Sequence, residues 1–139
     1  MENLLSLHFT LPEVNRISVL GLAHIGDGVY ELLVRSYLCV KGDTTLKNLH
    51  SDTIDMVKAP AQARYAALLY DMLTPEEQDF YRRGKNAHTH AAPKSASPRE
   101  YAMATGLETL FGALYLMGKT ERLTELFSVI TKEEIGHGV

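Results

Sequence analysis

The chain has 139 residues, 45% of them apolar, a net charge of −3 and a single cysteine, Cys39. These values fit one globular domain over residues 1–139 and exclude a disordered chain, and no apolar run reaches the roughly 18 residues of a membrane span. Without a signal-peptide pattern or a second cysteine for an intrachain disulfide, the sequence favours a cytoplasmic location.

Helix signals begin close to the N-terminus. The stretch Thr-Leu-Pro-Glu at 10–13 combines a capping threonine, a proline in the first turn and a glutamate at the reciprocal capping position. The helical pattern that it opens runs to Gly42, with a break expected near Gly21. Either Asp43 or Thr44 is expected to cap the next helix.

The second half of the chain shows the same kinds of helix-start and helix-stop signals. Pro60 interrupts the helical pattern, and an alanine- and leucine-rich helix follows it. Thr74 and Ser97 are each followed by proline and open two more helices, the second of which is expected to stop at Gly118. Thr120 opens the last helix. With no alternating strand pattern, the sequence predicts an all-α domain of about six or seven helices.

One segment, residues 82–99, differs from the rest because it is basic and rich in small polar residues. It holds five of the 14 lysines and arginines and no acid, which matters in a chain of net negative charge. One interpretation is a solvated connecting loop, and the other is a surface that grips phosphates. His88 and His90 lack a third ligand and are not expected to bind metal. The basic residues are Arg82, Arg83, Lys85, Lys94 and Arg99.

Two acids lie on otherwise apolar helix faces. Asp27 stands between Gly26 and Gly28, and Glu108 again has a glycine within one turn. A glycine inside a helix costs about 1 kcal/mol relative to alanine, and a carboxylate among apolar residues is costly unless something pairs with it. Glycine also lets another backbone or a ligand come close. The pattern predicts two helices that each present one acid toward the core.

Two carboxylates that meet in a partly buried pocket repel each other unless a cation lies between them. Mg²⁺ is the natural candidate, because it takes oxygen ligands, keeps several waters and bridges to substrate phosphates. Spacing alone leaves other interpretations open. Either acid would equally suit a helix cap, a salt bridge to an arginine, or simple exposure.

Two stretches carry a resemblance to a known family. "HIGDGVYELLVRSYL" at 24–38 and "ATGLETLFGALYLMG" at 104–118 resemble the signature helices of the ribonuclease III catalytic domain, in the short Mini-ribonuclease III form without a separate double-stranded-RNA-binding domain. The resemblance extends from Leu20 to Ile130. It implies an all-helical homodimer that cleaves double-stranded RNA with a divalent metal, leaving 5′-phosphate and 3′-hydroxyl ends. The Mini form further implies maturation of the large-subunit (23S) ribosomal RNA precursor.

The resemblance also implies residue roles. Asp27 matches the family's catalytic aspartate and Glu108 its catalytic glutamate, and both would hold Mg²⁺, or Mn²⁺, which activates a water and stabilises the leaving oxygen. A-form RNA is recognised mostly by shape across its minor groove, so the basic segment is the expected RNA-binding surface. The RNA-binding candidates are Arg82, Arg83, Lys85, Asn86 and Lys94.

Three departures keep alternatives open. Longer ribonuclease III proteins carry further acids where this chain has Leu20, Ala23 and Thr105, an absence that the Mini form shares. A catalytically silent RNA-binding scaffold is therefore the second hypothesis. A helical phosphohydrolase of the HD type is the third, and it is disfavoured because no histidine is followed by aspartate.

Overall fold

The computed structural model describes residues 2–42, 44–87 and 95–136, and the described residues form helices and connecting turns without a strand. This confirms the all-α prediction. The helices are α1 (Leu11–Val14), α2 (Val19–Lys41), α3 (Leu46–Val57), α4 (Ala59–Leu69), the 3₁₀ helix η1 (Tyr70–Met72), α5 (Pro75–Lys85), α6 (Pro98–Leu116) and α7 (Thr120–Gly136).

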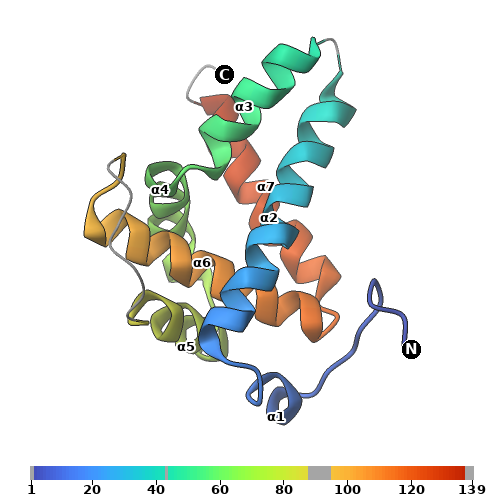
Figure 1. Cartoon of the computed structure of the whole chain (residues 1–139), viewed down its shortest axis with the longest axis vertical. Helices are drawn as coiled ribbons and strands as arrows, with labels where there is room; N and C mark the ends of the chain where they lie inside the picture. The colour runs from blue at the N-terminus through green and yellow to red at the C-terminus, as the bar shows by residue number, and fades with distance from the viewer. Residues whose placement is uncertain (1, 43, 88–94, 137–139) are drawn as a thin grey trace.

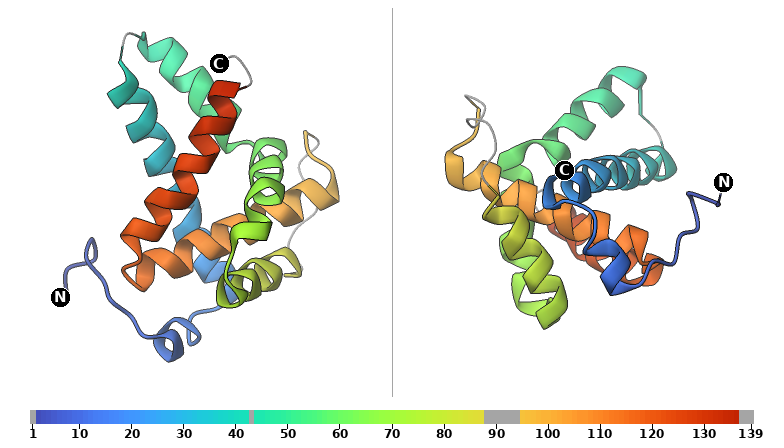
Figure 2. Two further views of the ribbon diagram at one scale, coloured as in Figure 1. Left: turned by 180° about the vertical axis from the view of Figure 1, so that it is seen from behind. Right: turned by 60° about the horizontal axis from the view of Figure 1, so that its bottom comes forward.

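Helix α6 is the centre of the fold. It contacts α2, α4, α5 and α7, and 12 of its residues are buried. Figure 1 shows α2 crossing α6, with α3 folding back alongside α2 and with α4 and α5 to one side. The reverse view in Figure 2 shows α7 covering the back of the molecule. The apolar face of α7 is buried, as the sequence predicts, and consists of Leu123, Leu126, Phe127 and Ile130.

The predicted capping threonines and serine form reciprocal hydrogen bonds with the glutamate three residues later. Thr10, Thr74 and Ser97 each accept a backbone N–H while the glutamate accepts the cap residue's own N–H. Each such cap stabilises its helix by about 1 kcal/mol. Helix α6 ends at Leu116, and Gly118 takes a φ of 74° that reverses the chain into α7.

Two predicted boundaries are wrong. The break in the first helical stretch comes before Val19 rather than near Gly21, because the Ser18 hydroxyl accepts the Gly21 N–H at 3.0 Å and starts α2 there. Helix α3 is capped by Thr45 rather than by Thr44, since its hydroxyl accepts the Asn48 N–H at 3.1 Å. Asp43 lies outside the described residues.

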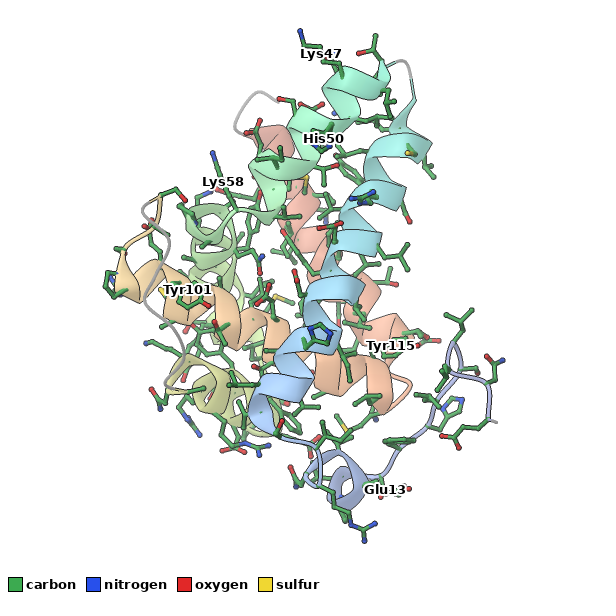
Figure 3. The ribbon with its side chains drawn as sticks, in the orientation of Figure 1. Glu13, Lys47, His50, Lys58, Tyr101 and Tyr115 are labelled. Carbon is green, nitrogen blue, oxygen red and sulfur yellow. The ribbon has the colours of Figure 1, made fainter. Side chains whose placement is uncertain are left out.

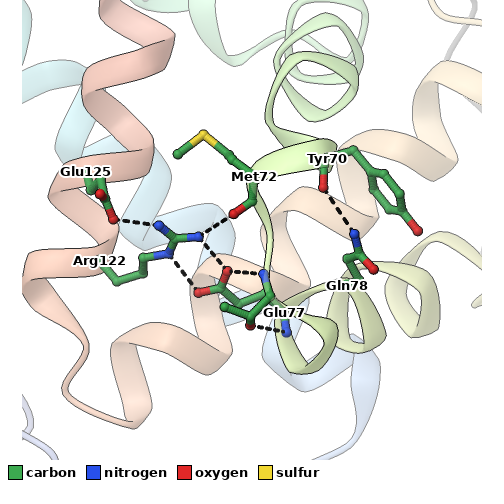
Figure 4. Close-up of polar contacts among 7 residues, drawn as sticks. Tyr70, Met72, Glu77, Gln78, Arg122 and Glu125 are labelled. Atoms are coloured by element: carbon green, nitrogen blue, oxygen red, sulfur yellow. Dashed lines mark hydrogen bonds and ion pairs between the residues drawn. The ribbon is translucent and has the colours of Figure 1, made fainter.

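Polar side-chain contacts join the outer helices to one another and hold the N-terminal segment against α6. Arg122 of α7 bonds both carboxylate oxygens of Glu77 at 2.8 and 2.9 Å and the Met72 carbonyl at 2.8 Å, joining α7 to η1 and α5 (Figure 4). Tyr115, near the end of α6 in Figure 3, donates its hydroxyl to the Leu4 carbonyl and holds the N-terminal segment. No described helix is both long and apolar enough to cross a membrane.

Candidate active site

The candidate site lies where α2 crosses α6, and two glycines allow the crossing to be unusually close. A Cβ atom on Gly26 would lie 1.6 Å from the Glu108 carbonyl oxygen, and one on Gly112 would lie 2.0 Å from the Leu22 carbonyl oxygen. No larger residue fits either position without separating the helices. A Cβ on Gly28 would meet no atom within 4 Å, so only the first glycine of the Gly-Asp-Gly run serves helix packing.

This close crossing brings the two predicted acids together. The exposed Asp27 of α2 and the half-buried Glu108 of α6 share a hydrogen bond. Burial, and after it the negative charge of Asp27, raise the pKa of Glu108 from 4.5 to about 8. Neither acid forms an ion pair with an arginine or lysine within the described ranges, and neither caps a helix there. The salt-bridge and helix-cap interpretations are therefore wrong.

A third polar side chain reaches the pair from α4. Gln62 is only 2% exposed, and its amide nitrogen donates to the Val57 carbonyl at 2.8 Å and lies 3.5 Å from a Glu108 carboxylate oxygen. Its amide oxygen is buried and finds no hydrogen-bond partner among the described residues. Sequence reasoning missed this residue. The available signal was a polar residue on a buried helix stripe that continues with Tyr65, Ala66 and Leu69.

No third carboxylate from the described ranges joins the site. Ala23 is buried and apolar, and Thr105 donates its hydroxyl to the Tyr101 carbonyl of its own helix at 3.0 Å. Glu31, one turn after Asp27, pairs with Arg35 at 2.8 Å. Accordingly, the described part of the chain contains no cluster of three or more histidine, cysteine, aspartate or glutamate side chains suited to a metal.

The residues present nevertheless fit a hard divalent cation. Mg²⁺ is commonly bound through one or two protein carboxylates and completes its shell with waters and substrate phosphates. Asp27 and Glu108 supply two carboxylates whose mutual repulsion a cation would relieve, and the unpartnered Gln62 oxygen is a further acceptor in the same place. Nitrogen- or sulfur-preferring metals find no matching ligand set among the described residues.

The predicted RNA-binding residues lie one helix away. Arg82, Arg83 and Lys85 form the last turn of α5 rather than a loop, which corrects the boundary of the basic segment, and the exposed Asn86 is its C-cap. This turn lies against α6, because Gly84 packs onto Gly106 and Thr109. Lys94, like His88 and His90, falls outside the described residues.

The basic side chains of this turn are partly engaged within the chain. Arg82 lies 3.8 Å and Arg83 3.2 Å from Asp79, both with substantial exposure. Arg83 also donates to Asn15 at 3.0 Å and lies over the Phe80 ring at 4.6 Å. Arg83 therefore contributes to packing as well as to positive charge.

The chain is similar to proteins of one known family. The Ribonuclease III domain family matches residues 20–119. A Mini-ribonuclease 3 of Symbiobacterium thermophilum is 49% identical over 107 residues, which cover 77% of this chain and 82% of that protein. A Mini-ribonuclease 3 of Clostridium tetani is 40% identical over 123 residues, covering 88% of this chain and 82% of that protein. A crystal structure of a Fusobacterium nucleatum protein superposes with a TM-score of 0.78 at 30% identity, covering 83% of this chain and 93% of that one.

Proposed function

The chain belongs to the ribonuclease III family and is an endoribonuclease, and from that premise we propose that it cleaves double-stranded RNA with a divalent metal ion, Mg²⁺ or Mn²⁺, held by Asp27 and Glu108. The observation that carries this proposal is the meeting of two carboxylates, one exposed and one half-buried, at the close crossing of α2 and α6. When bound, the ion supplies an activated water and stabilises charge on the leaving oxygen.

The chain's own residues set up that chemistry. The contact between Gly26 and α6 fixes the separation of the two helices, so the carboxylates are held in place before any ligand arrives. Because Glu108 is buried beside Asp27, double ionisation of the pair is unfavourable without a cation and becomes favourable with one. Asp27 is exposed, which lets an RNA phosphate approach from solvent.

The basic turn at the end of α5 is the proposed RNA-binding surface. Arg82, Arg83, Lys85 and Asn86 lie beside the α6 segment that carries Glu108, and Lys94 follows them in the sequence. Arginine and lysine bind backbone phosphates, and an amide suits the 2′-hydroxyls of the A-form minor groove. In this proposal, the backbone of an RNA held here extends across α6 to the acid pair.

Two further elements belong to the same proposal. The chain acts as a homodimer whose seam includes Ile25, Val29 and Leu32, since Leu32 is 62% exposed and the other two are only partly buried. Its cellular substrate is the large-subunit (23S) ribosomal RNA precursor, an extension that rests on the similarity to proteins named Mini-ribonuclease 3. The exposed free Cys39 suits a reducing cytoplasm.

The direct test is incubation of the purified chain with long double-stranded RNA, with Mg²⁺ or with a chelator, followed by gel analysis. The proposal expects cleavage only with the metal and products with 5′-phosphate and 3′-hydroxyl ends. A matched single-stranded RNA should be cut far more slowly. Equal cleavage with the chelator, or equal cleavage of both RNAs, would contradict the proposal.

A further inference from the structure

The buried amide of Gln62 links the catalytic pair to a distant corner of the fold. Gln62 lies in the first turns of α4, and its nitrogen bonds the carbonyl of Val57, the last residue of α3. The same nitrogen lies 3.5 Å from Glu108 on α6. One side chain therefore connects the corner between α3 and α4, marked by Lys58 in Figure 3, with the carboxylate proposed to hold the metal.

The orientation of the amide follows from its neighbours. The Val57 carbonyl and the Glu108 carboxylate are both acceptors, so the NH₂ group must face them. Its two N–H groups serve one acceptor each, so Glu108 is restrained by a donor from α4. The contact to Glu108 is long, and such bonds shorten when the acceptor carries a full negative charge.

The amide oxygen is left as a buried acceptor without a partner. A buried polar group of this kind costs about 1–3 kcal/mol when unsatisfied, so it calls for an explanation. The oxygen belongs to the same amide whose nitrogen contacts Glu108, so it lies close to that carboxylate. The waters bound to a divalent cation held by Glu108 can donate a hydrogen bond to this oxygen.

Two of the positions where longer ribonuclease III proteins carry further acids, Ala23 and Thr105, supply no polar contact to Glu108. Ala23 has no polar group, and the Thr105 hydroxyl is committed to the Tyr101 carbonyl. Among the described side chains, Gln62 is the polar group that reaches Glu108 besides Asp27.

We propose that Gln62 is a positioning residue for the metal site: its amide nitrogen orients Glu108, and its amide oxygen accepts a hydrogen bond from the hydration shell of the bound ion. This inference rests on the proposed function, in which Glu108 holds the metal. Partners of this kind orient the metal ligands, and their loss typically lowers metal affinity about 10- to 100-fold.

The test compares Mn²⁺ binding by the RNA-free protein, measured from the electron paramagnetic resonance signal of free Mn²⁺. The main variant is Gln62→Met, which keeps an unbranched side chain of similar length and removes both amide functions. Gln62→Leu is the second variant, because an apolar side chain of similar volume is tolerated in place of a buried amide. We expect either variant to raise the Mn²⁺ dissociation constant about 10- to 100-fold.

The matched control is Gln78→Leu, which removes a second glutamine, half-buried, that donates to the backbone carbonyl of Tyr70 at 3.3 Å, away from the site (Figure 4). This variant should bind Mn²⁺ like the natural chain. Cleavage measured against Mn²⁺ concentration should require more metal in the Gln62 variants and recover at saturation. RNA affinity in the absence of metal should be unchanged.

The outcomes separate this inference from the proposed function. If the natural chain binds no Mn²⁺ and cleaves no double-stranded RNA with it, both fail. If the natural chain does both and the Gln62 variants bind Mn²⁺ within twofold of it, only the role of Gln62 is overturned. A lower melting temperature with unchanged Mn²⁺ affinity would also overturn it, because that result marks a purely structural residue.

Discussion

Alanine substitutions at two glycines in one helix should have opposite effects on stability. At Gly26 the new methyl group would lie 1.6 Å from the Glu108 carbonyl oxygen and 2.8 Å from the Gly112 nitrogen, both backbone atoms that cannot rotate away. Ordinary contacts are about 3.5 Å or more, so α2 and α6 must separate by roughly 2 Å. At Gly28 the methyl group meets nothing within 4 Å.

The magnitudes follow from these distances. Overpacking typically costs about 1–3 kcal/mol, and a backbone collision lies at or above the upper end, while alanine regains about 1 kcal/mol of helix propensity. Gly26→Ala should therefore lose a net of about 2 kcal/mol or more of unfolding free energy. Gly28→Ala should gain up to about 1 kcal/mol.

Thermal unfolding in a chelating buffer checks both values. For a chain of this length, 1 kcal/mol corresponds to about 3–4 °C, so Gly26→Ala should lower the melting temperature by roughly 7 °C or more. Gly28→Ala should raise it by about 3 °C. The packing account would be refuted if Gly26→Ala melted at the temperature of the natural chain, or if Gly28→Ala were the less stable of the two.

Four further predictions concern charge and assembly. Because the pKa of Glu108 is raised from 4.5 to about 8 in the folded metal-free protein, its contribution to stability is full below pH 4.5 and is lost as the pH rises through about 8. Melting temperatures measured with a chelator across this range should show the decline, and Glu108→Gln should flatten it. Replacing Arg82 and Lys85 together with glutamine should weaken RNA binding and reduce the slope of log affinity against log salt by about 1 for each phosphate that is no longer neutralised, while an unchanged slope would place the RNA-binding surface elsewhere. Arg83→Gln should in addition lower the melting temperature, because the arginine bonds Asn15 and packs on Phe80. Light scattering should give a mass near twice 15.5 kDa, and a monomer at micromolar concentration would contradict the dimer.

Local chemistry made much of the fold predictable from the sequence. The caps at Thr10, Thr74 and Ser97 were predicted correctly, because a capping box depends on residues only three positions apart. The basic turn was placed in a loop because the segment around Gly84 is rich in small polar residues. In the structure this glycine instead accommodates the close approach of Thr109 and α6, and the helix continues to Lys85.

The site itself was predictable only in part. Asp27 and Glu108 stood out because an acid beside glycine on an apolar helix face is costly without a partner. Gln62 contacts Glu108 across 46 positions of sequence, and no local pattern encodes that contact. The two glycines that flank Asp27 show the same limit, since only the structure distinguishes the packed Gly26 from the open Gly28.

The central claim is that Asp27 holds the metal that cleaves RNA, and the cleavage rate of Asp27→Asn tests it most directly. Asparagine is nearly isosteric with aspartate but lacks its charge, so the fold and the basic turn of α5 should remain intact. The metal-dependent rate on double-stranded RNA should fall by about two orders of magnitude or more, because losing one such catalytic charge costs about 3 kcal/mol or more. Melting temperature and metal-free RNA affinity, measured on the same variant, should stay close to those of the natural chain. Full cleavage activity in Asp27→Asn would contradict the account.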